Sequence, residues 1–414
     1  MRRLACLLLL VVGTCAAAAG APAAKAAPGL QLGIDDDSFL YSMDASLNAA
    51  WSIGVHIVRV NAMWSPAPGY AYSLGGLRFT GAVSQLAQSA HGWNVQVVVS
   101  FFPARAADAP QDDASRRQFC GAAAQLVQQQ PQIVAIIIGN EPNTARYWQP
   151  QYNADGTPAS PQSYFQTMAL CYDMLHAVDP GINVVGPATS DRGNDNPHAD
   201  SNVSISPAVF IAGLGRAYRA SGRTTPIFDT IDHHPYPLNS AERPWKHHTD
   251  KRVIGEGDLS RLVAAYQSAF AGTNQPVPGR CVANRCIGIW YSEDGFQTRI
   301  DPSLAGNYRN VETDKLAVPA DSPPETGPLP PATSRAPSQT QQLRDAVSLA
   351  YCQPYVQAFF NFQLDDEASL AGWQAGLMYA NGQPKPGFAW YAVLSYDVAA
   401  GKIDCSRYAS ALRG

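Results

Sequence analysis

The sequence predicts an α/β fold, a (β/α)8 TIM barrel with long loops on its C-terminal face. Eight short apolar segments alternate with helical patterns along the chain. The apolar segments are rich in Val, Ile and Phe and mostly continuous, which is typical of strands buried on both faces of a parallel sheet. The longest irregular segments follow strands rather than helices. An open doubly wound sheet is the alternative, but no G-x-G-x-x-G motif follows the first strand.

Residues 1–27 have the three-part layout of a secretory signal peptide. Two arginines precede the apolar run Leu4–Val12, and the small-residue stretch that follows ends in Ala24-Lys25-Ala26. The run is too short to span a membrane, and no longer apolar stretch follows. We therefore expect a secreted, extracellular protein without a membrane span. A buried N-terminal helix and lipid anchoring at Cys15 are the weaker alternatives.

Residues 28–414 are expected to form a single catalytic barrel. The predicted strands are Leu30–Asp35, Ile57–Met63, Val95–Phe102, Ile133–Gly139, Ile182–Gly186, Phe228–His234, Ile287–Glu293 and Val356–Gln363. The predicted helices are Asp44–Ile53, Gly81–His91, Ala114–Gln129, Pro161–Val178, Pro207–Ala220, Leu259–Ala271, Gln339–Tyr351 and Phe388–Ala399. Pro161 and Pro207 suit the first turn of a helix.

One insertion, near residues 300–338, contains seven prolines between Pro319 and Pro337. In isolation this composition is typical of an interdomain linker. A helix and a strand still follow it, however, and the barrel needs both. We therefore expect a Pro-rich loop that lies over the site on the C-terminal face.

The cysteine content indicates disulfide bonds, and the net charge argues against some classes of binding partner. Beyond the signal the cysteines are even in number, as disulfides require: Cys120, Cys171, Cys281, Cys286, Cys352 and Cys405. Six cysteines allow 15 connectivities, and the sequence does not choose between them, although Cys281 and Cys286 could close a local loop. The same region has 26 basic and 33 acidic residues, a net charge of −7. This balance argues against a nucleic acid or an anionic membrane as the main partner.

Two predicted strands end in a glutamate. The fourth ends in Asn140-Glu141-Pro142-Asn143, and the seventh ends in Ser292-Glu293-Asp294. These strands lie across a barrel from each other, so both carboxylates can converge on one cleft. Hydrolysis of a glycosidic bond needs such a pair, one to protonate the leaving oxygen and one to attack or to activate water. Strand alternation cannot point Asn140 and Glu141 inward together, so a bulge or a bend is required.

The Asn-Glu-Pro motif on strand four and the glutamate on strand seven resemble the clan A retaining glycoside hydrolases, the cellulase and β-xylosidase type. The resemblance implies that Glu141 is the general acid/base and that Glu293 is the nucleophile. It also implies that Asn140 contacts the sugar 2-hydroxyl.

Two further positions match this clan. Arg59 on strand two corresponds to an arginine that supports the nucleophile, and His234-x-Tyr236 corresponds to a His-x-Tyr motif from which Tyr236 would hydrogen-bond Glu293. Strand eight departs from the pattern because it ends without the usual tryptophan. Phe362 or Trp373 is expected to take that place.

Aromatic and polar clusters add weaker expectations. Four tryptophans at or after strand ends are candidate walls of a sugar site, with ordinary packing an equal alternative: Trp64, Trp148, Trp245 and Trp373. Three in helix-side segments are expected in the core: Trp51, Trp93 and Trp390. The run Asp35-Asp36-Asp37 is expected to be a solvated turn rather than a cation site. His233-His234 and His247-His248 match no zinc motif, so no metal and no other cofactor is expected.

The sequence thus favours a secreted retaining glycoside hydrolase that cleaves β-glycosidic bonds in an oligo- or polysaccharide by a two-glutamate double displacement. The alternative is a non-catalytic carbohydrate-binding or cell-surface protein that kept the barrel. The pattern selects no particular sugar or linkage.

Overall fold

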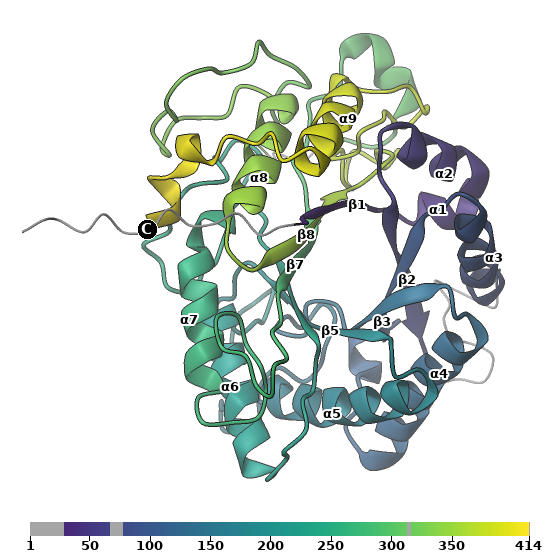
Figure 1. Ribbon diagram of the computed structural model, residues 1–414, viewed down its shortest axis with the longest axis vertical. Helices are drawn as coiled ribbons and strands as arrows, with labels where there is room; N and C mark the ends of the chain where they lie inside the picture. The colour runs from purple at the N-terminus through teal and green to yellow at the C-terminus, as the bar shows by residue number, and fades with distance from the viewer. Residues whose placement is uncertain (1–28, 67–77, 313–315, 414) are drawn as a thin grey trace, which may run out of the picture.

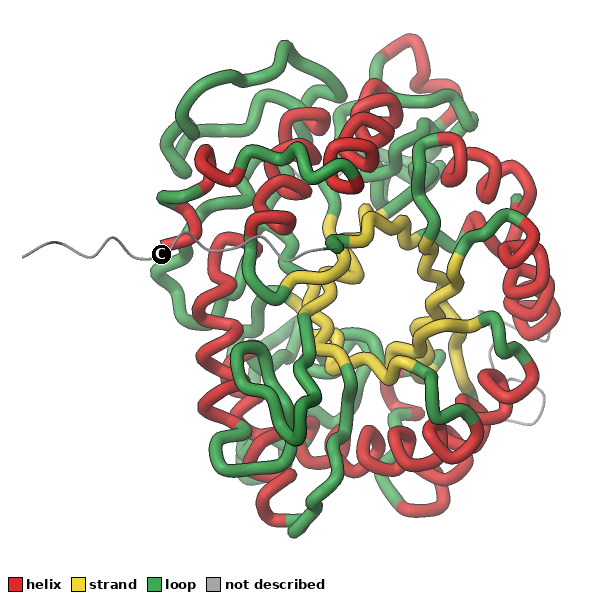
Figure 2. Tube along the Cα trace, viewed as in Figure 1, coloured by secondary structure: helices red, strands yellow, loops and turns green. Residues whose placement is uncertain are grey.

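The computed structural model describes residues 29–66, 78–312 and 316–413. Eight parallel strands close into a barrel in chain order, and helices surround it (Figures 1 and 2). The predicted (β/α)8 barrel is therefore confirmed. The strands are β1 (Gln31–Asp35), β2 (Ile57–Trp64), β3 (Gln96–Pro103), β4 (Ile133–Ile138), β5 (Asn183–Ser190), β6 (Thr230–His234), β7 (Ile289–Asp294) and β8 (Val356–Phe362).

Every predicted helix is present, with ends that differ by a few residues. The helices are α1 (Ser38–Tyr41), α2 (Met43–Ser52), α3 (Arg78–Gly92), α4 (Asp113–Gln129), α5 (Ser160–Val178), α6 (Pro207–Ala220), α7 (Leu259–Ala269), α8 (Gln339–Cys352) and α9 (Pro386–Ala399). The sequence did not predict α1, a single turn. Short 3₁₀ helices are η1 (Ala106–Asp108), η2 (Glu256–Asp258), η3 (Pro302–Asn307), η4 (Cys405–Tyr408) and η5 (Ala411–Arg413).

The strands are apolar on both faces because each face packs against a different core. On β3, Val97 and Val99 belong to the large cluster that includes helix residues, whereas Val98 belongs to a small cluster of strand residues. On β4, Ile136 and Ile137 divide in the same way. Successive side chains on a strand point to opposite faces, so the small cluster fills the barrel interior and the large one fills the layer beneath the helices.

Three disulfides stabilise the outer layer. Their pairs are Cys120–Cys171, Cys281–Cys286 and Cys352–Cys405. The first joins α4 to α5, the second closes a small loop before β7, and the third ties the end of α8 to η4. The expected disulfides are present, including the local loop.

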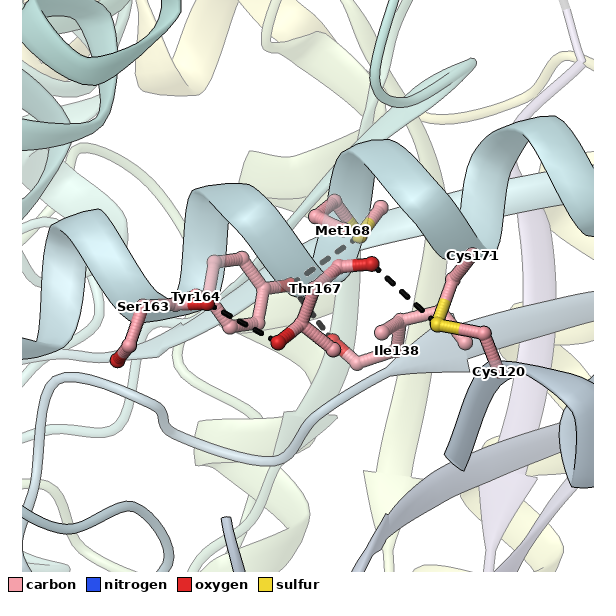
Figure 3. Close-up of a disulfide and its surroundings, with 7 residues drawn as sticks. All are labelled: Cys120, Ile138, Ser163, Tyr164, Thr167, Met168 and Cys171. Carbon is pink, nitrogen blue, oxygen red and sulfur yellow. Dashed lines mark hydrogen bonds between the residues drawn. A yellow bond between two sulfur atoms is a disulfide. The ribbon is translucent and has the colours of Figure 1, made fainter. Parts of the chain in front are cut away.

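Helix α5 also holds the end of β4 in place. Tyr164 on this helix donates a hydrogen bond of 2.6 Å from its hydroxyl to the carbonyl of Ile138, the last residue of the strand (Figure 3). Tyr164 lies two helical turns before Cys171, so the disulfide to α4 anchors the same helix (Figure 3). The strand end that precedes Glu141 is therefore fixed by a buried contact from α5.

The Pro-rich segment does not lie over the barrel mouth as expected. Glu325 accepts two hydrogen bonds from Arg243, at 2.7 and 2.8 Å, and its amide donates to Gln341 on α8. The amide of Ala336 donates to the carbonyl of Ala241. No residue of 319–337 lines the large cleft of the barrel mouth. The segment instead braces the loop that follows β6 against α8, which corrects the expectation.

The predicted signal peptide, with its alternative lipid site Cys15, lies outside the described residues. Within the described part of the chain, no helix is both long enough and apolar enough to cross a membrane.

The entropy of loop closure predicts that removing different disulfides lowers the free energy of unfolding by different amounts. Cys120 and Cys171 are separated by 51 positions, whereas Cys281 and Cys286 are separated by 5. Replacing the first pair with alanine should lower the free energy of unfolding by about 4 kcal/mol, and replacing the second by about 2 kcal/mol. Denaturant unfolding of the two double variants measures this difference. Equal losses would show that these disulfides do not stabilise the protein mainly by restricting the unfolded chain.

Candidate active site

The chain bends sharply where β4 ends. Gly139 has φ +80°, and a Cβ at this position would lie 2.9 Å from a ring carbon of Tyr164, so the position requires glycine. Glu141 has φ +37°, in the left-handed region that non-glycine residues seldom adopt. These conformations turn Asn140 and Glu141 toward the barrel interior together. The bend that the sequence required is therefore present.

Arg59 on β2 is a fully buried cation at the centre of the barrel mouth. It forms an ion pair with Asp35 at the end of β1. It also donates hydrogen bonds to Glu293 at 2.7 Å and to the side-chain oxygen of Asn140 at 3.1 Å. A buried charge is tolerated only where it is paired, so this arginine fixes the positions of side chains from three other strand ends.

Glu293 near the end of β7 receives donors from three sides. Besides Arg59, the Tyr236 hydroxyl donates to it at 3.2 Å, and His234 Nδ1 lies 3.5 Å from the same oxygen. Burial raises the pKa of this carboxyl, but the charges of His234 and Arg59 and the hydrogen bonds outweigh burial and bring the pKa below its usual range. Glu293 is therefore ionised at neutral pH.

His234 at the end of β6 lies between the two glutamates. Its Nδ1 is 3.3 Å from Glu141 Oε1, and its Nε2 is 3.2 Å from the Ser292 hydroxyl, which donates at 2.6 Å to Asp232. Burial lowers the pKa of this imidazole, but the charge of Glu293 and the contacts with Glu141 and Asp232 raise it to about 9. His234 is thus a cation at neutral pH.

A cleft of 830 Å³ opens over these residues. Glu141 and Glu293 both line it, together with Tyr236, Phe362 and Trp373. The Trp373 ring lies 5.4 Å from both the Tyr236 ring and the Phe362 ring, measured between centroids. Both residues expected to replace the strand-eight tryptophan therefore reach the cleft beside Tyr236.

Three predicted members of the site do not line this cleft. Asn140, Arg59 and His234 are buried beneath it, where they contact the glutamates or each other. The structure brings them to the site but places them behind the surface that a ligand would touch.

The other candidate tryptophans lie in the core. Trp64 packs edge-on against Phe119, and Trp148 donates to the Ser163 hydroxyl at 3.0 Å. Trp245 is buried as well. The expectation that these tryptophans wall a sugar site is wrong, because long loops and helices cover them. Trp51, expected in the core, is 51% exposed, which is a second correction.

The aspartate run after β1 is not the solvated turn that we expected. Asp35 is fully buried against Arg59, Asp36 accepts the amides of Leu364 and Asp365, and Asp37 accepts the amide of Asn61. The run therefore ties β1 to the segments after β8 and to β2. Sequence reasoning missed the role of Asp35, although an arginine inside a barrel strand requires a buried anion nearby.

Glu141, His234 and Glu293 present ligand atoms within 4.8 Å of one another, a spacing that also suits a metal ion. A metal needs the neutral imidazole, whereas the surrounding carboxylates favour the protonated ring of His234. His248 is held between Glu242 and Asp258 at 2.9 and 2.7 Å, and His233 between Thr189 and a backbone carbonyl. The arrangement around the two glutamates suits proton transfer better than metal binding.

Comparisons with known proteins show the fold. No protein-family model matches this sequence, and no curated protein matches it either. A glucosidase from Croceicoccus marinus is 12% identical with a TM-score of 0.54, over 85% of this chain and 63% of its own. The exo-β-1,4-mannosidase Op5Man5 from Opitutaceae bacterium strain TAV5 is 12% identical with a TM-score of 0.50, over 90% and 60%. The GH53 catalytic domain from Ignisphaera aggregans is 14% identical with a TM-score of 0.53, over 90% and 98%. The chain thus spans less than two thirds of the first two proteins.

Removing the buried cation should destabilise the protein. Arg59→Met leaves the buried Asp35 without its cationic partner and removes one of the two cations beside Glu293, and we expect a loss of about 3–5 kcal/mol in the free energy of unfolding. Adding Asp35→Asn should recover part of it, because one orphaned charge disappears. Denaturant unfolding of both single variants and the double variant gives the coupling energy. Purely additive losses would contradict a direct ion pair.

The protonated His234 should stabilise the fold in a defined pH window. Because its pKa is raised to about 9 in the folded protein, its contribution is complete below its ordinary pKa near 6.5 and is lost as pH rises through about 9. The difference in Tm between wild type and His234→Gln should therefore shrink across that window. The raised pKa of His248 affects both proteins alike and cancels. A pH-independent difference would show that His234 is neutral.

Proposed function

We propose that this protein hydrolyses β-glycosidic bonds with retention of anomeric configuration. One observation carries the proposal: Glu141 and Glu293, on different strand ends, face the same cleft, and one oxygen of each carboxylate lies within 4.8 Å of one oxygen of the other. Retaining enzymes hold their carboxyl groups at about 5–5.5 Å, whereas inverting enzymes need about 6.5–9.5 Å to admit a water molecule. The short spacing favours direct attack by one carboxylate.

Glu293 is the nucleophile in this proposal. Arg59, Tyr236 and His234 keep its carboxylate ionised and oriented. One oxygen attacks the anomeric carbon, the bond to the leaving oxygen breaks, and a covalent glycosyl-enzyme forms. The buried donors stabilise the charge before attack without the reorganisation that water would need.

Glu141 is the general acid/base. Its side chain is 18% exposed and lines the cleft, so it can reach both the leaving oxygen and an incoming water. In the first step its proton passes to the leaving oxygen. In the second step it takes a proton from the water that attacks the anomeric carbon, which releases Glu293 and restores both glutamates.

The surrounding residues suit a sugar ring. Trp373, Phe362 and Tyr236 offer aromatic surface beside Glu293, against which the C–H face of a sugar can pack. Asn140 accepts from Arg59 through its oxygen beneath the cleft, so in this proposal it orients Arg59 and does not contact the sugar itself. No cofactor takes part in this reaction.

Two further findings support the proposal. Several solved structures with this fold are glycoside-cleaving proteins by name, among them a glucosidase and a mannosidase. Three disulfides are typical of a protein that works in an oxidising compartment, in agreement with the predicted signal peptide.

Replacing the two glutamates separates their roles. Glu293→Gln should lower kcat by at least about 10⁴-fold on every substrate, because the covalent step is lost. Glu141→Ala should lower kcat by about 10²–10⁴-fold on substrates with a poor leaving group, and less on nitrophenyl glycosides, whose leaving group needs little protonation. A panel of aryl β-glycosides and oligosaccharides, followed by NMR of the first anomer released, measures both turnover and stereochemistry.

The exposed Glu312, which lies outside the cleft, provides the matched control as Glu312→Gln. Release of the β-anomer by wild type and the control, but not by Glu293→Gln, is the expected result. Inversion would contradict the role of Glu293. Binding of a glycan without any turnover would favour the non-catalytic carbohydrate-binding alternative.

A further inference from the structure

The cleft continues beyond the two glutamates into a region lined by three arginines. Arg146 follows β4, Arg192 follows β5, and Arg252 belongs to the loop after β6. We call this region, with Asp191 and Asp250, the arginine arm. All three guanidinium groups are exposed within the same 830 Å³ cleft that contains Glu141 and Glu293.

Backbone contacts join the loops that carry these arginines. Arg192 forms an antiparallel bridge with Val253, which places Arg192 and Arg252 on neighbouring segments. Thr144 forms another bridge with Ser204, and the amide of Ala145 donates to the carbonyl of Val203 at 2.8 Å, just before Arg146. The loops after β4, β5 and β6 therefore form one connected rim. A connected rim holds its side chains in place before a ligand arrives.

The arginine arm has more cations than anions, whereas the protein as a whole has a net negative charge. Residues 28–414 carry a net charge of −7, yet this arm has three cations and two anions. Arg252 pairs with Asp250 at 2.8 Å and Arg192 with Asp191 at 3.3 Å. Burial raises the pKa of Asp191 to about 7 against the opposing charge of Arg192, so Asp191 carries only part of its charge at neutral pH.

Arg146 has no carboxylate partner among the described residues. Its guanidinium lies over the Tyr147 ring, 5.4 Å from the centroid. A guanidinium has five N–H donors in a fork that fits a carboxylate or a sulfate, and the donors of Arg192 and Arg252 are only partly used. Amide and hydroxyl groups are sufficient to bind a neutral sugar, whereas three guanidinium groups lining one cleft add positive charge that only an anion would use. The arm therefore fits an anionic ligand.

The arginine arm extends from the side of the cleft that carries Glu141. Arg146 is five positions after Glu141 on the same loop, and of the two glutamates only Glu141 acts on the pKa of Asp191, which it raises. The aromatic group of Trp373, Phe362 and Tyr236 lies instead beside Glu293. In the proposed reaction the acid stands next to the leaving oxygen, so the arm borders the leaving-group side.

We propose that the substrate is an acidic glycan, and that the arginine arm binds an anionic sugar residue on the leaving-group side of the scissile bond. This inference rests on the proposed glycosidase function for its orientation. Its chemistry, binding of a carboxylated or sulfated oligosaccharide in this cleft, can be tested without turnover.

The experiment uses the mature full-length protein carrying Glu293→Gln, so that ligands bind without being cleaved. Titration calorimetry would compare neutral cello- and xylo-oligosaccharides with uronate-containing and sulfated oligosaccharides of equal length. We expect at least one acidic class to bind roughly 10-fold or more tightly than the neutral ones, because its anion gains charge-assisted hydrogen bonds. That preference should weaken between about 20 and 300 mM salt, since exposed charges are screened.

Arginine variants in the same background locate the contact. Arg146→Gln should weaken binding of the acidic ligand by about 5- to 10-fold, and Arg146→Lys by less, because lysine keeps the charge but not the fork. The matched control is Arg335→Gln, an exposed arginine of the Pro-rich segment outside the cleft, which should leave the affinity unchanged. Preference for uronate or for sulfate identifies the anion.

Three results would overturn the proposal: no binding by any acidic oligosaccharide, equal binding of neutral ligands that salt does not affect, or unchanged affinity in Arg146→Gln and in Arg192→Gln/Arg252→Gln. The proposed function fails separately. If wild-type protein binds acidic oligosaccharides through the arm but cleaves no glycoside, the inference about the ligand holds while the hydrolase assignment fails.

Discussion

The structure of the barrel mouth depends on one buried cation. Arg59, near the start of β2, lies where β1, β4 and β7 end, and it contacts Asp35, Asn140 and Glu293. Removing a guanidinium from water costs several kcal/mol, which only close anionic partners offset. This cost makes close partners obligatory, and they come from the ends of β1, β4 and β7. The contact that orients Glu293 also helps to offset the cost of burying the charge of Arg59.

A second layer of constraint comes from outside the barrel. The bend at Gly139 packs against Tyr164, which also donates to Ile138, and the helix carrying Tyr164 is linked to α4 by a disulfide. The position of Glu141 is thus determined by helix packing, whereas that of Glu293 is determined by buried charge. The two supports are connected, because His234 contacts both glutamates and Arg59 contacts both Glu293 and Asn140. Such rigid elements suit a site that needs carboxylates at fixed separation.

The sequence predicted the barrel well because most of its strand residues are buried on both faces and most strands read as largely continuous apolar runs. The strand-end glutamates stood out because a carboxylate at the end of an apolar strand is conspicuous, whereas Arg59 and the His-x-Tyr pair were expected only from the family resemblance. Trp64 and Trp148 were misplaced because burial beneath loops and helices depends on tertiary packing, which local pattern does not encode. The pairing of Asp35 with Arg59, 24 positions apart, likewise needed the barrel to be closed.

The placement of His234 between Glu141 and Glu293 has a consequence for the charge balance of the reaction cycle. In the resting protein the negative charge of Glu293 is the strongest influence that favours the protonated ring. When Glu293 becomes an ester in the proposed intermediate, that charge disappears while Asp232 remains in place. The imidazolium then holds its proton less tightly, so the two half-reactions take place in different electrostatic surroundings although no atom of the scaffold has to move.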